Sequence, residues 1–184
     1  MPNPTTHFST RLDIAEPIRT NAIALLNKTL ASTLDLKTQV KQAHWNVKGK
    51  DFYQLHLLFD EMSVELEEFI DIVAERVTSL GGYALGTTRA AAKNSELPEY
   101  EFDAIDSMDH VTALADRFAI YGKSTRHGIE KTQELGDADT ADIYTQISRV
   151  IDKRLWFLEA HLQRKAINET SNSKSTSGVK VGAK

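Results

Sequence analysis

Residues 42–75 decide both the fold and the candidate site, and they read QAHWNVKGKDFYQLHLLFDEMSVELEEFIDIVAE. Two pairs of metal-ligating side chains in this stretch are spaced four residues apart, His56 with Asp60 and Asp71 with Glu75. Residues at this spacing share one face of a helix, about 5–6 Å apart at Cβ, so each pair can hold a cation between its side chains. Imidazole together with carboxylate is a ligand set that suits iron.

The separation of the two pairs indicates that one chain cannot complete a metal site alone. Asp60 and Asp71 are 11 residues apart, which is close to three full turns and about 16 Å along a helix axis. Metal–ligand bonds are only about 2.0–2.6 Å long, so both pairs cannot reach one ion from the same helix. We expect an antiparallel, two-fold pairing of this helix with a second copy, which would create two equivalent sites per dimer.

Composition narrows the class of protein. The chain has 184 residues and a formal charge of −4, which is enough length for one domain and argues against a basic DNA-binding body. It contains no cysteine, so any metal must be held by nitrogen and oxygen. No run approaches the ~20 apolar residues of a membrane span, and the start, MPNPTTHFSTRLD, lacks the apolar core of a secretory signal. We expect a cytoplasmic protein with no membrane partner, in a compartment where it could associate with the nucleoid.

Apolar residues recur at helical spacing through most of the chain. The pattern predicts four long helices, at about residues 17–46, 51–80, 107–135 and from 137–140 to about 168. The breaks between them are marked by Gly49, by Gly81 with Gly82, and by Gly136. Residues 83–106 have no clean period and contain Pro98, so we interpret them as a long crossover with room for one short helix.

Two long helices, a long crossover and two more long helices define an all-α, ferritin-like four-helix bundle, with the crossover between helices 2 and 3. The bundle is expected to span residues 17–168. Residues 1–16 are expected to be a flexible N-terminal segment, and residues 169–184 a disordered tail rich in lysine and serine, with too few apolar side chains to fold. The chain lacks GxGxxG, GxSxG and HExxH motifs, and also the E-x-x-H motif with which other ferritin-like bundles build a site inside one chain.

Three segments together resemble the Dps family, named for a DNA-binding protein from starved cells. They are QAHWNVKGKDFYQLHLLFDEM at residues 42–62, DIVAERVTSLGG at residues 71–82 and TADIYTQISRVIDKRLWFLEAHL at residues 140–162. The resemblance covers roughly residues 20–165, nearly the whole expected bundle. It implies a homo-dodecamer, a hollow shell that oxidises Fe(II) with hydrogen peroxide in preference to oxygen and stores the ferric mineral inside.

The resemblance also assigns the metal ligands. It implies a diiron site, where Fe(II) becomes Fe(III), that is shared between two-fold-related subunits. The ligands are His44, His56 and Asp60 from one subunit, and Asp71 and Glu75 from its neighbour. The last member of the catalytic set is Trp45, which matches a tryptophan near the site. It either packs over the iron or accepts an oxidising equivalent that would otherwise escape as a radical.

Three acidic residues open the fourth predicted helix, Asp137, Asp139 and Asp142. A structural reason is sufficient for them, because carboxylates stabilise the positive end of a helix. In the family that the chain resembles, this region lines three-fold pores that admit Fe(II), and a carboxylate repeated three times would focus a strong negative field on a cation. We expect the pore role, with Asp142 as its best candidate.

Two further groups of side chains were considered as metal-binding residues, one of glutamates and one of histidines. Carboxylates on the second predicted helix fit equally an iron nucleation patch on the inner wall of a shell and an ordinary solvated face; they are Glu61, Glu65 and Glu68. The later histidines lack a ligand partner four residues further along the chain, and we expect them to be structural; they are His110, His127 and His161.

The charge of the chain bears on whether the protein binds DNA. A shell of twelve chains at −4 each would carry roughly −48 and repel phosphate at long range. Binding would need the C-terminal tail, whose Lys174, Lys180 and Lys184 would be repeated around a shell. It would be independent of sequence and weaken steeply with salt. The leading interpretation is a ferroxidase and iron store that protects DNA, and the alternative is a nucleoid-compacting DNA-binding protein with a secondary iron site.

Overall fold

The structure is a computed structural model that describes residues 8–176, with side chains described up to residue 163. The described residues form five helices and no strand: α1 (Glu16–Asn46), α2 (Phe52–Ser79), α3 (Thr88–Asn94), α4 (Ser107–Leu135) and α5 (Ala138–Thr176). The predicted all-α fold is confirmed, including one short helix inside the crossover. In this part of the chain, no helix combines the length and the apolar character that crossing a membrane requires.

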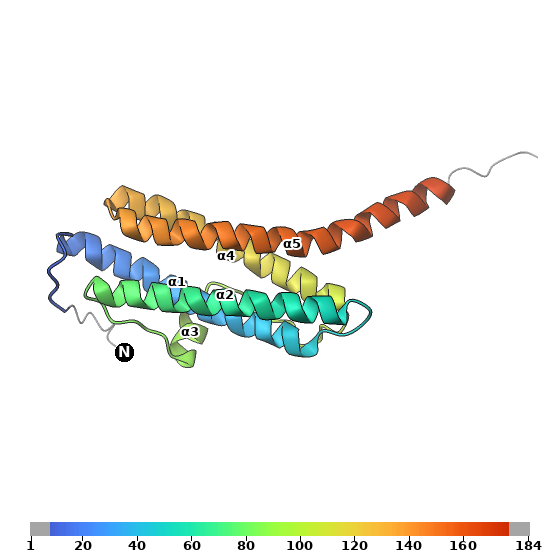
Figure 1. Ribbon diagram of the computed structural model, residues 1–184, viewed down its shortest axis with the longest axis horizontal. Helices are drawn as coiled ribbons and strands as arrows, with labels where there is room; N and C mark the ends of the chain where they lie inside the picture. The colour runs from blue at the N-terminus through green and yellow to red at the C-terminus, as the bar shows by residue number, and fades with distance from the viewer. Residues whose placement is uncertain (1–7, 177–184) are drawn as a thin grey trace, which may run out of the picture.

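The four long helices form two antiparallel pairs (Figure 1). α1 packs along α2 and α4 packs along α5, and the crossover between α2 and α4 carries α3, which packs against α1. Because this crossover travels the length of the bundle, α2 and α4 run in the same direction. The turn between α1 and α2 therefore lies at the end of the bundle where α4 begins. This is the ferritin-like arrangement with one long connection.

Helix boundaries follow local chemistry in most places. α1 has Pro17 in its first turn, where the missing N–H costs nothing. Asp51 occupies the N-cap position of α2, but its side chain makes no capping hydrogen bond. α4 ends at Gly136, whose φ of 80° lies in the left-handed region that glycine adopts without strain. α5 continues to Thr176, past the predicted end near Asn168, since no glycine or proline interrupts the chain there.

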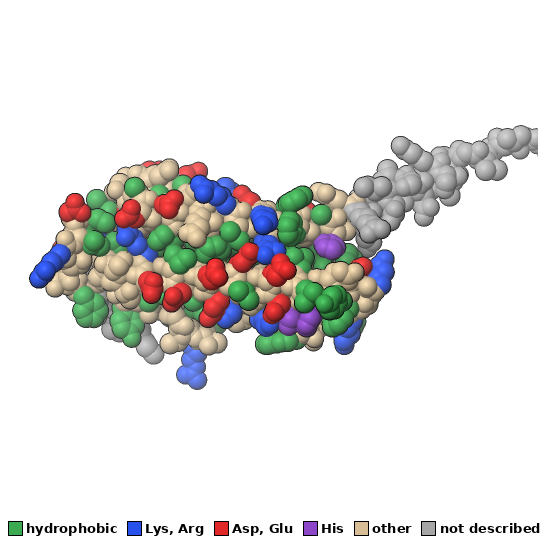
Figure 2. Space-filling view, in the orientation of Figure 1, with side chains coloured by type: hydrophobic (Ala, Val, Ile, Leu, Met, Phe, Trp, Pro, Cys, Tyr) green, Lys and Arg blue, Asp and Glu red, His purple; other side chains and the backbone are tan. Residues whose placement is uncertain are grey.

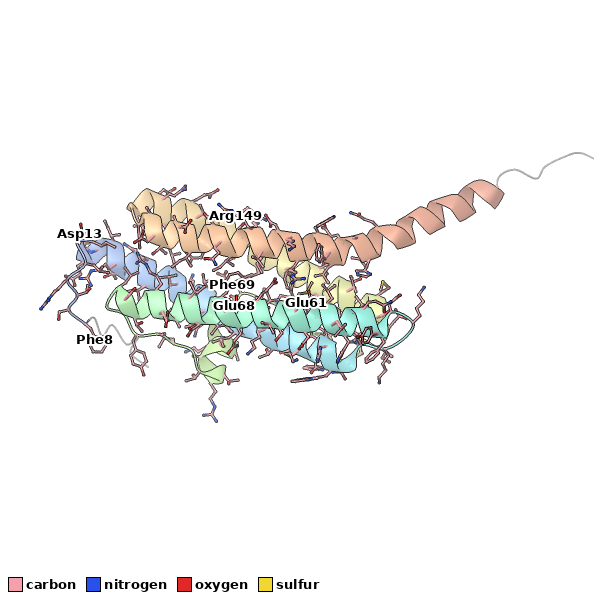
Figure 3. The ribbon with its side chains drawn as sticks, viewed as in Figure 1. Phe8, Asp13, Glu61, Glu68, Phe69 and Arg149 are labelled. Carbon is pink, nitrogen blue, oxygen red and sulfur yellow. The ribbon has the colours of Figure 1, made fainter. Side chains whose placement is uncertain are left out.

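The segment before α1 is held against the end of α2. The N–H of Phe8 (labelled in Figure 3) donates to the carbonyl of Gly81 at 2.7 Å. Arg19 donates to the carbonyls of Ile14 and Leu80 at 3.1 and 2.9 Å. Phe8 and Ile14, which lie in the segment that we expected to be flexible, therefore have hydrogen-bond partners in the bundle. Residues 1–7 lie outside the described part of the chain.

The apolar stripes predicted for the long helices meet in one core between the two helix pairs. Its buried members include Leu26, Leu55, Phe59, Leu114 and Ile147. Two tyrosines are buried in the same core with partners for their hydroxyls. The Tyr121 oxygen lies 2.6 Å from the Thr33 hydroxyl, and the Tyr144 oxygen lies 2.8 Å from the Thr29 hydroxyl. These bonds offset the cost of taking polar groups out of water.

The crossover is fastened to the bundle by Arg117, the largest of the fully buried side chains that the structure describes. From α4, its guanidinium donates to the Gln39 side chain at 2.5 Å, to the carbonyl of Ala113 at 2.9 Å, and to the carbonyl of Glu99. It also lies over the ring of Tyr100, with Cζ 5.3 Å from the centroid. The buried charge is tolerated because its donors are satisfied.

Candidate metal centre

The two predicted histidine ligands lie side by side at the turn between α1 and α2. His44 is in the last turn of α1, and His56 is in the second turn of α2. Nδ1 of His44 donates to the main-chain carbonyl of His56 at 2.8 Å, and Nδ1 of His56 donates to the carbonyl of His44 at 2.9 Å. The rings stack with centroids 3.8 Å apart and an interplanar angle of 19°. Each histidine therefore fixes the ring of the other.

This reciprocal bonding decides which nitrogen each ring can offer to a metal. A carbonyl oxygen only accepts, so Nδ1 carries a proton in both rings, and Nε2 of the neutral imidazole keeps its lone pair. Histidines that bind a metal through one nitrogen almost always donate the other N–H to a carbonyl, carboxylate or water, which orients the ring. The fold alone orients His44 and His56 in this way. Phe52 adds a stacked contact on His56, with 5.1 Å between ring centroids.

Asp60, the third predicted ligand, stands one turn after His56 and is held by a lysine. Nζ of Lys41 donates to Oδ1 of Asp60 at 2.8 Å, and Nδ1 of His44 is 3.9 Å from the same oxygen. The hydrogen bond and charge of Lys41 hold the pKa of Asp60 below its usual range, with smaller contributions from the two histidines. Half of the Asp60 side chain is exposed, so a cation can reach the carboxylate from solvent by displacing Lys41.

The second predicted pair, Asp71 and Glu75, lies on the exposed side of α2. Within the described part of the chain, no three metal-ligating side chains gather at one point. One chain therefore presents two separate sets of predicted ligands, neither of which gathers three side chains around one point: His44, His56 and Asp60 near the α1–α2 turn, and Asp71 and Glu75 further along α2. Their union in one site stays a prediction about the assembled protein.

Trp45 stands beside the histidines and faces solvent. Its side chain is 67% exposed, and Nζ of Lys41 lies 5.9 Å from its ring centroid. It lines a groove of about 640 Å³ between α1 and the crossover, together with Tyr100 and Phe102. Aromatic rings of this kind are enriched at protein interfaces.

The three acidic residues predicted for a pore differ in their surroundings. Asp137 is buried, and its Oδ1 accepts from Arg76 at 2.7 Å and from the N–H of Thr140 at 3.1 Å, while its Oδ2 accepts from the Thr140 hydroxyl at 2.5 Å. It therefore caps the start of α5 inside the bundle. Asp139 and Asp142 are exposed. Because both oxygens of Asp137 are already engaged, only Asp139 and Asp142 have carboxylates available for a pore.

Acidic side chains gather along α2, where Figure 2 shows a row of them on the face in view. Figure 3 labels two of the predicted nucleation residues in this row, Glu61 and Glu68. Arg154 reaches across from α5, donating to both oxygens of Glu65 at 2.7 Å and to Glu61 at 3.1 Å. Glu61 and Glu65 therefore have a structural role between two helices, and Glu68, which is exposed, is the remaining nucleation candidate.

The later histidines lie apart from the candidate centre. His110 is buried and bonded to Tyr100, His127 is exposed on α4, and His161 is half-buried on α5. None of them belongs to a cluster of metal-ligating side chains within the described residues. The predicted DNA-binding lysines, Lys174, Lys180 and Lys184, lie outside the described side chains.

Comparison with known proteins agrees with this geometry. Residues 23–167 match the ferritin family, described as a ferritin-like domain. The chain therefore belongs to the ferritin-like class that its bundle and ligand-bearing helices define. A DNA protection during starvation protein from Agrobacterium fabrum (strain C58) is 42% identical over 157 residues, which make up 85% of this chain and 97% of that protein.

Similar solved structures identify the family within the ferritin-like class. DpsC from Streptomyces coelicolor has a TM-score of 0.82 and 32% identity, over 85% of this chain and 92% of that chain. A Dps protein from Vibrio cholerae O1, described as a member of a broad superfamily of ferritin-like diiron-carboxylate proteins, has a TM-score of 0.78 and 28% identity, over 84% of this chain and 98% of that chain. Within the ferritin-like class, this chain is a member of the Dps family.

Proposed function

We propose that this protein is a ferroxidase and iron store. It oxidises Fe(II) with hydrogen peroxide, or oxygen, at sites shared between two-fold-related copies, and keeps the ferric mineral inside a dodecameric shell. The observation that carries the proposal is the reciprocal bonding of His44 and His56, which leaves Nε2 of both rings as the ligand atom. The diiron-carboxylate description of the Vibrio relative supports iron as the metal.

Each kind of ligand has its own task in the proposed reaction. The neutral imidazoles of His44 and His56 suit Fe(II). The anionic oxygens of Asp60, and of Asp71 and Glu75 from the neighbouring copy, suit the harder Fe(III). A mixed ligand set therefore admits the reactant and stabilises the product, while the protein supplies geometry and charge.

The reaction balances when two Fe(II) ions are held together. One hydrogen peroxide accepts one electron from each ion and, with two protons, becomes two water molecules. If a single ion supplied one electron, the O–O bond would break to give hydroxide and a hydroxyl radical. A site that holds two ions close together therefore consumes peroxide without releasing this radical, which would protect nearby DNA.

Asp139 and Asp142 are proposed to attract Fe(II) at a three-fold pore of the shell. Both are exposed at the start of α5, and three-fold repetition would concentrate their charge around one axis. Glu68 is the proposed nucleation residue, because Glu61 and Glu65 are already engaged by Arg154.

DNA binding is the second candidate function. The Agrobacterium relative is named a DNA protection during starvation protein, and binding is one way to protect DNA. The formal charge of −4 opposes it, so binding would depend on Lys174, Lys180 and Lys184. A gel shift of duplex DNA at two salt concentrations, with the full chain and with a chain that ends at Asn168, is the test. A shift lost on shortening and at the higher salt concentration supports tail-dependent binding. No shift at low salt contradicts it.

The ferroxidase function is tested by adding hydrogen peroxide to protein and Fe(II) without oxygen, and by following Fe(III) absorbance. We expect two Fe(II) to be consumed per peroxide, faster than in buffer. His44→Ala should slow the reaction by at least about 10-fold. Glu67→Gln, which changes an exposed carboxylate one turn before Asp71, is the matched control and should not. A verified shell that reacts no faster than buffer would contradict the proposal.

A further inference from the structure

Tyr100 and His110 form a buried hydrogen-bonded pair near the candidate metal centre. The phenolic oxygen of Tyr100 lies 2.6 Å from Nδ1 of His110. The rings are nearly parallel, with centroids 6.1 Å apart and an interplanar angle of 17°. Tyr100 is 4% exposed and His110 is 1% exposed. The pair joins the crossover to the first turn of α4, at the end of the bundle where the α1–α2 turn lies.

The proton between Tyr100 and His110 is bonded to the phenolic oxygen of Tyr100. Burial raises the pKa of Tyr100 well above its ordinary value and lowers the pKa of His110, so both groups are neutral near pH 7. The Tyr100 hydroxyl therefore donates and Nδ1 of His110 accepts, which puts the ring proton on Nε2. Among the described residues, this Nε2 is a buried side-chain atom without a hydrogen-bond partner, with the main chain of Asn46 close by. The imidazole is thus a base positioned to receive the phenolic proton.

The other buried tyrosines provide an internal comparison. Burial also raises the pKa of Tyr121, and it raises the pKa of Tyr144 to about 12. Their hydroxyls are bonded to Thr33 and Thr29, and a threonine hydroxyl cannot take up a proton near neutral pH. Among the tyrosines buried in the described structure, Tyr100 is therefore the one whose hydroxyl is bonded to a base.

We propose that Tyr100 and His110 form a redox-active pair that absorbs a single oxidising equivalent inside the protein. Tyr100 gives one electron to a strong one-electron oxidant, which is thereby reduced, and its O–H proton moves to Nδ1 of His110. The products are a neutral phenoxyl radical and an imidazolium. When a reductant such as Fe(II) returns one electron, the proton moves back and the pair is restored. The oxidant is a hydroxyl radical, formed when peroxide accepts one electron, or the oxidised Trp45 that such a radical leaves.

Neighbouring charges favour a neutral radical over a positively charged one. The guanidinium of Arg117 lies over the Tyr100 ring, 5.3 Å from its centroid, and disfavours a further positive charge on that ring. The carboxylate of Glu101, which pairs with Arg117 at 3.2 Å, acts on Tyr100 in the opposite sense and more weakly. Loss of the electron is therefore easiest when the proton leaves at the same time. Asp109 and Asp106, at the start of α4, act on His110 in the opposite sense and favour its protonated form.

The pair is placed to intercept oxidation that begins at the metal centre. Tyr100 and Trp45 line the same groove between α1 and the crossover. Asn46, the residue after Trp45, lies beside the His110 ring. The inference goes beyond the proposed ferroxidase, because it concerns single electrons that the two-electron reaction does not use, and it holds whether or not that reaction occurs.

The test uses the full-length, metal-free protein, so that its outcome does not depend on ferroxidase activity. Photogenerated tris(bipyridine)ruthenium(III) is the one-electron oxidant, and electron paramagnetic resonance detects the radical. We expect a long-lived phenoxyl signal that is lost in Tyr100→Phe. Tyr121→Phe, the matched change at a buried tyrosine bonded to Thr33, should keep it. A double variant, Tyr53→Phe with Tyr83→Phe, removes two exposed tyrosines and should also keep it.

The part played by His110 is measured first in the unmodified chain, because replacing a buried histidine can itself destabilise the fold. In protein containing isotope-labelled histidine, electron–nuclear double resonance should detect coupling between the phenoxyl radical and an imidazole nitrogen. His110→Gln, checked for folding, offers an acceptor oxygen but no base, and should abolish the long-lived signal. A signal that survives Tyr100→Phe, a radical without nitrogen coupling, or no tyrosine radical at all would each overturn the proposal.

Discussion

His44 and His56 hold each other in place, since each ring donates through Nδ1 to the main-chain carbonyl of the other residue, at 2.8 and 2.9 Å. The two residues come from different helices, so the packing of α1 against α2 sets the direction of both Nε2 atoms. Ligands that are held before binding lose less conformational freedom when a metal arrives. The turn between these helices therefore belongs to the proposed metal site as much as the ligands do.

Lys41→Gln should increase the affinity of the predicted ligand set near the α1–α2 turn for a divalent cation. The change removes the ammonium that pairs with Asp60 at 2.8 Å, so an entering ion no longer competes with it. The gain should reach at most about fivefold, because an exposed ion pair is weak in water. Calorimetric titration of metal-free protein with Co(II) measures it.

The matched control is Lys37→Gln, one turn earlier on α1, where the lysine pairs with Glu67 instead. Its affinity for Co(II) should equal that of the unmodified protein. Equal or weaker affinity in Lys41→Gln would show that this lysine does not compete with the cation.

Asp137→Ala should lower the stability of the protein, whereas Asp139→Ala should leave stability nearly unchanged and slow iron entry. The first change removes a helix cap and leaves the half-buried Arg76 without its closest carboxylate, so the free energy of unfolding should fall by about 2–4 kcal/mol. Asp139 is 82% exposed, and its loss should change stability by less than about 0.5 kcal/mol.

The rate of iron uptake by the shell should depend on the exposed residues instead of on Asp137. Asp139→Ala and Asp142→Ala are expected to slow the entry of Fe(II), because each removes negative charge at the proposed pore. Urea unfolding and uptake kinetics on the same preparations make the comparison. Uptake at the unmodified rate in the Asp139→Ala, Asp142→Ala double variant would remove the pore assignment.

His110 should make the protein less stable as pH falls below about 6.5. Burial lowers the pKa of His110 below its ordinary value of 6.5, so the unfolded chain binds this proton more readily than the native state. The free energy of unfolding should therefore decrease from pH 6.5 down to the native pKa, and be constant above that range as far as this group is concerned.

His110→Gln should remove this part of the pH dependence, which urea unfolding at several pH values would measure. His127→Gln, a change at an exposed histidine of the same helix, is the control and should retain the slope of the unmodified chain. Identical slopes in all three proteins would mean that His110 has the same proton affinity in both states.

The sequence was sufficient for features that repeat at helical spacing. The all-α bundle, the long crossover and its short helix were predicted, because apolar stripes of period near 3.6 and glycine breaks are local signals. The positions of Asp71 and Glu75 on an exposed face of α2 also follow from that period. The end of α5 was predicted too early, since polar composition alone does not stop a helix.

No local sequence pattern predicts the contacts between segments that lie far apart in the sequence. Arg117 occupies a core position on α4 and is satisfied by Gln39, 78 residues away in sequence. Asp137 was expected at a helix end or a pore, and the pattern did not indicate that Arg76, 61 residues away, donates to it inside the bundle. Arg154 likewise reaches Glu65 from 89 residues away. Such pairs depend on which helices become neighbours, and no pattern within one helix encodes that.

Each metal site is proposed to be built by two copies, and shells that mix two variants show whether it is. His56→Ala and Asp71→Ala should each abolish rapid Fe(II) oxidation in shells of one variant. Where the two variants meet, one of the two sites at the interface combines an intact His56 with an intact Asp71. Random mixing should therefore restore about a quarter of the sites, because half of the interfaces are mixed and half of their sites are intact. Recovery near that level supports the shared site, and no recovery in verified mixed shells contradicts it.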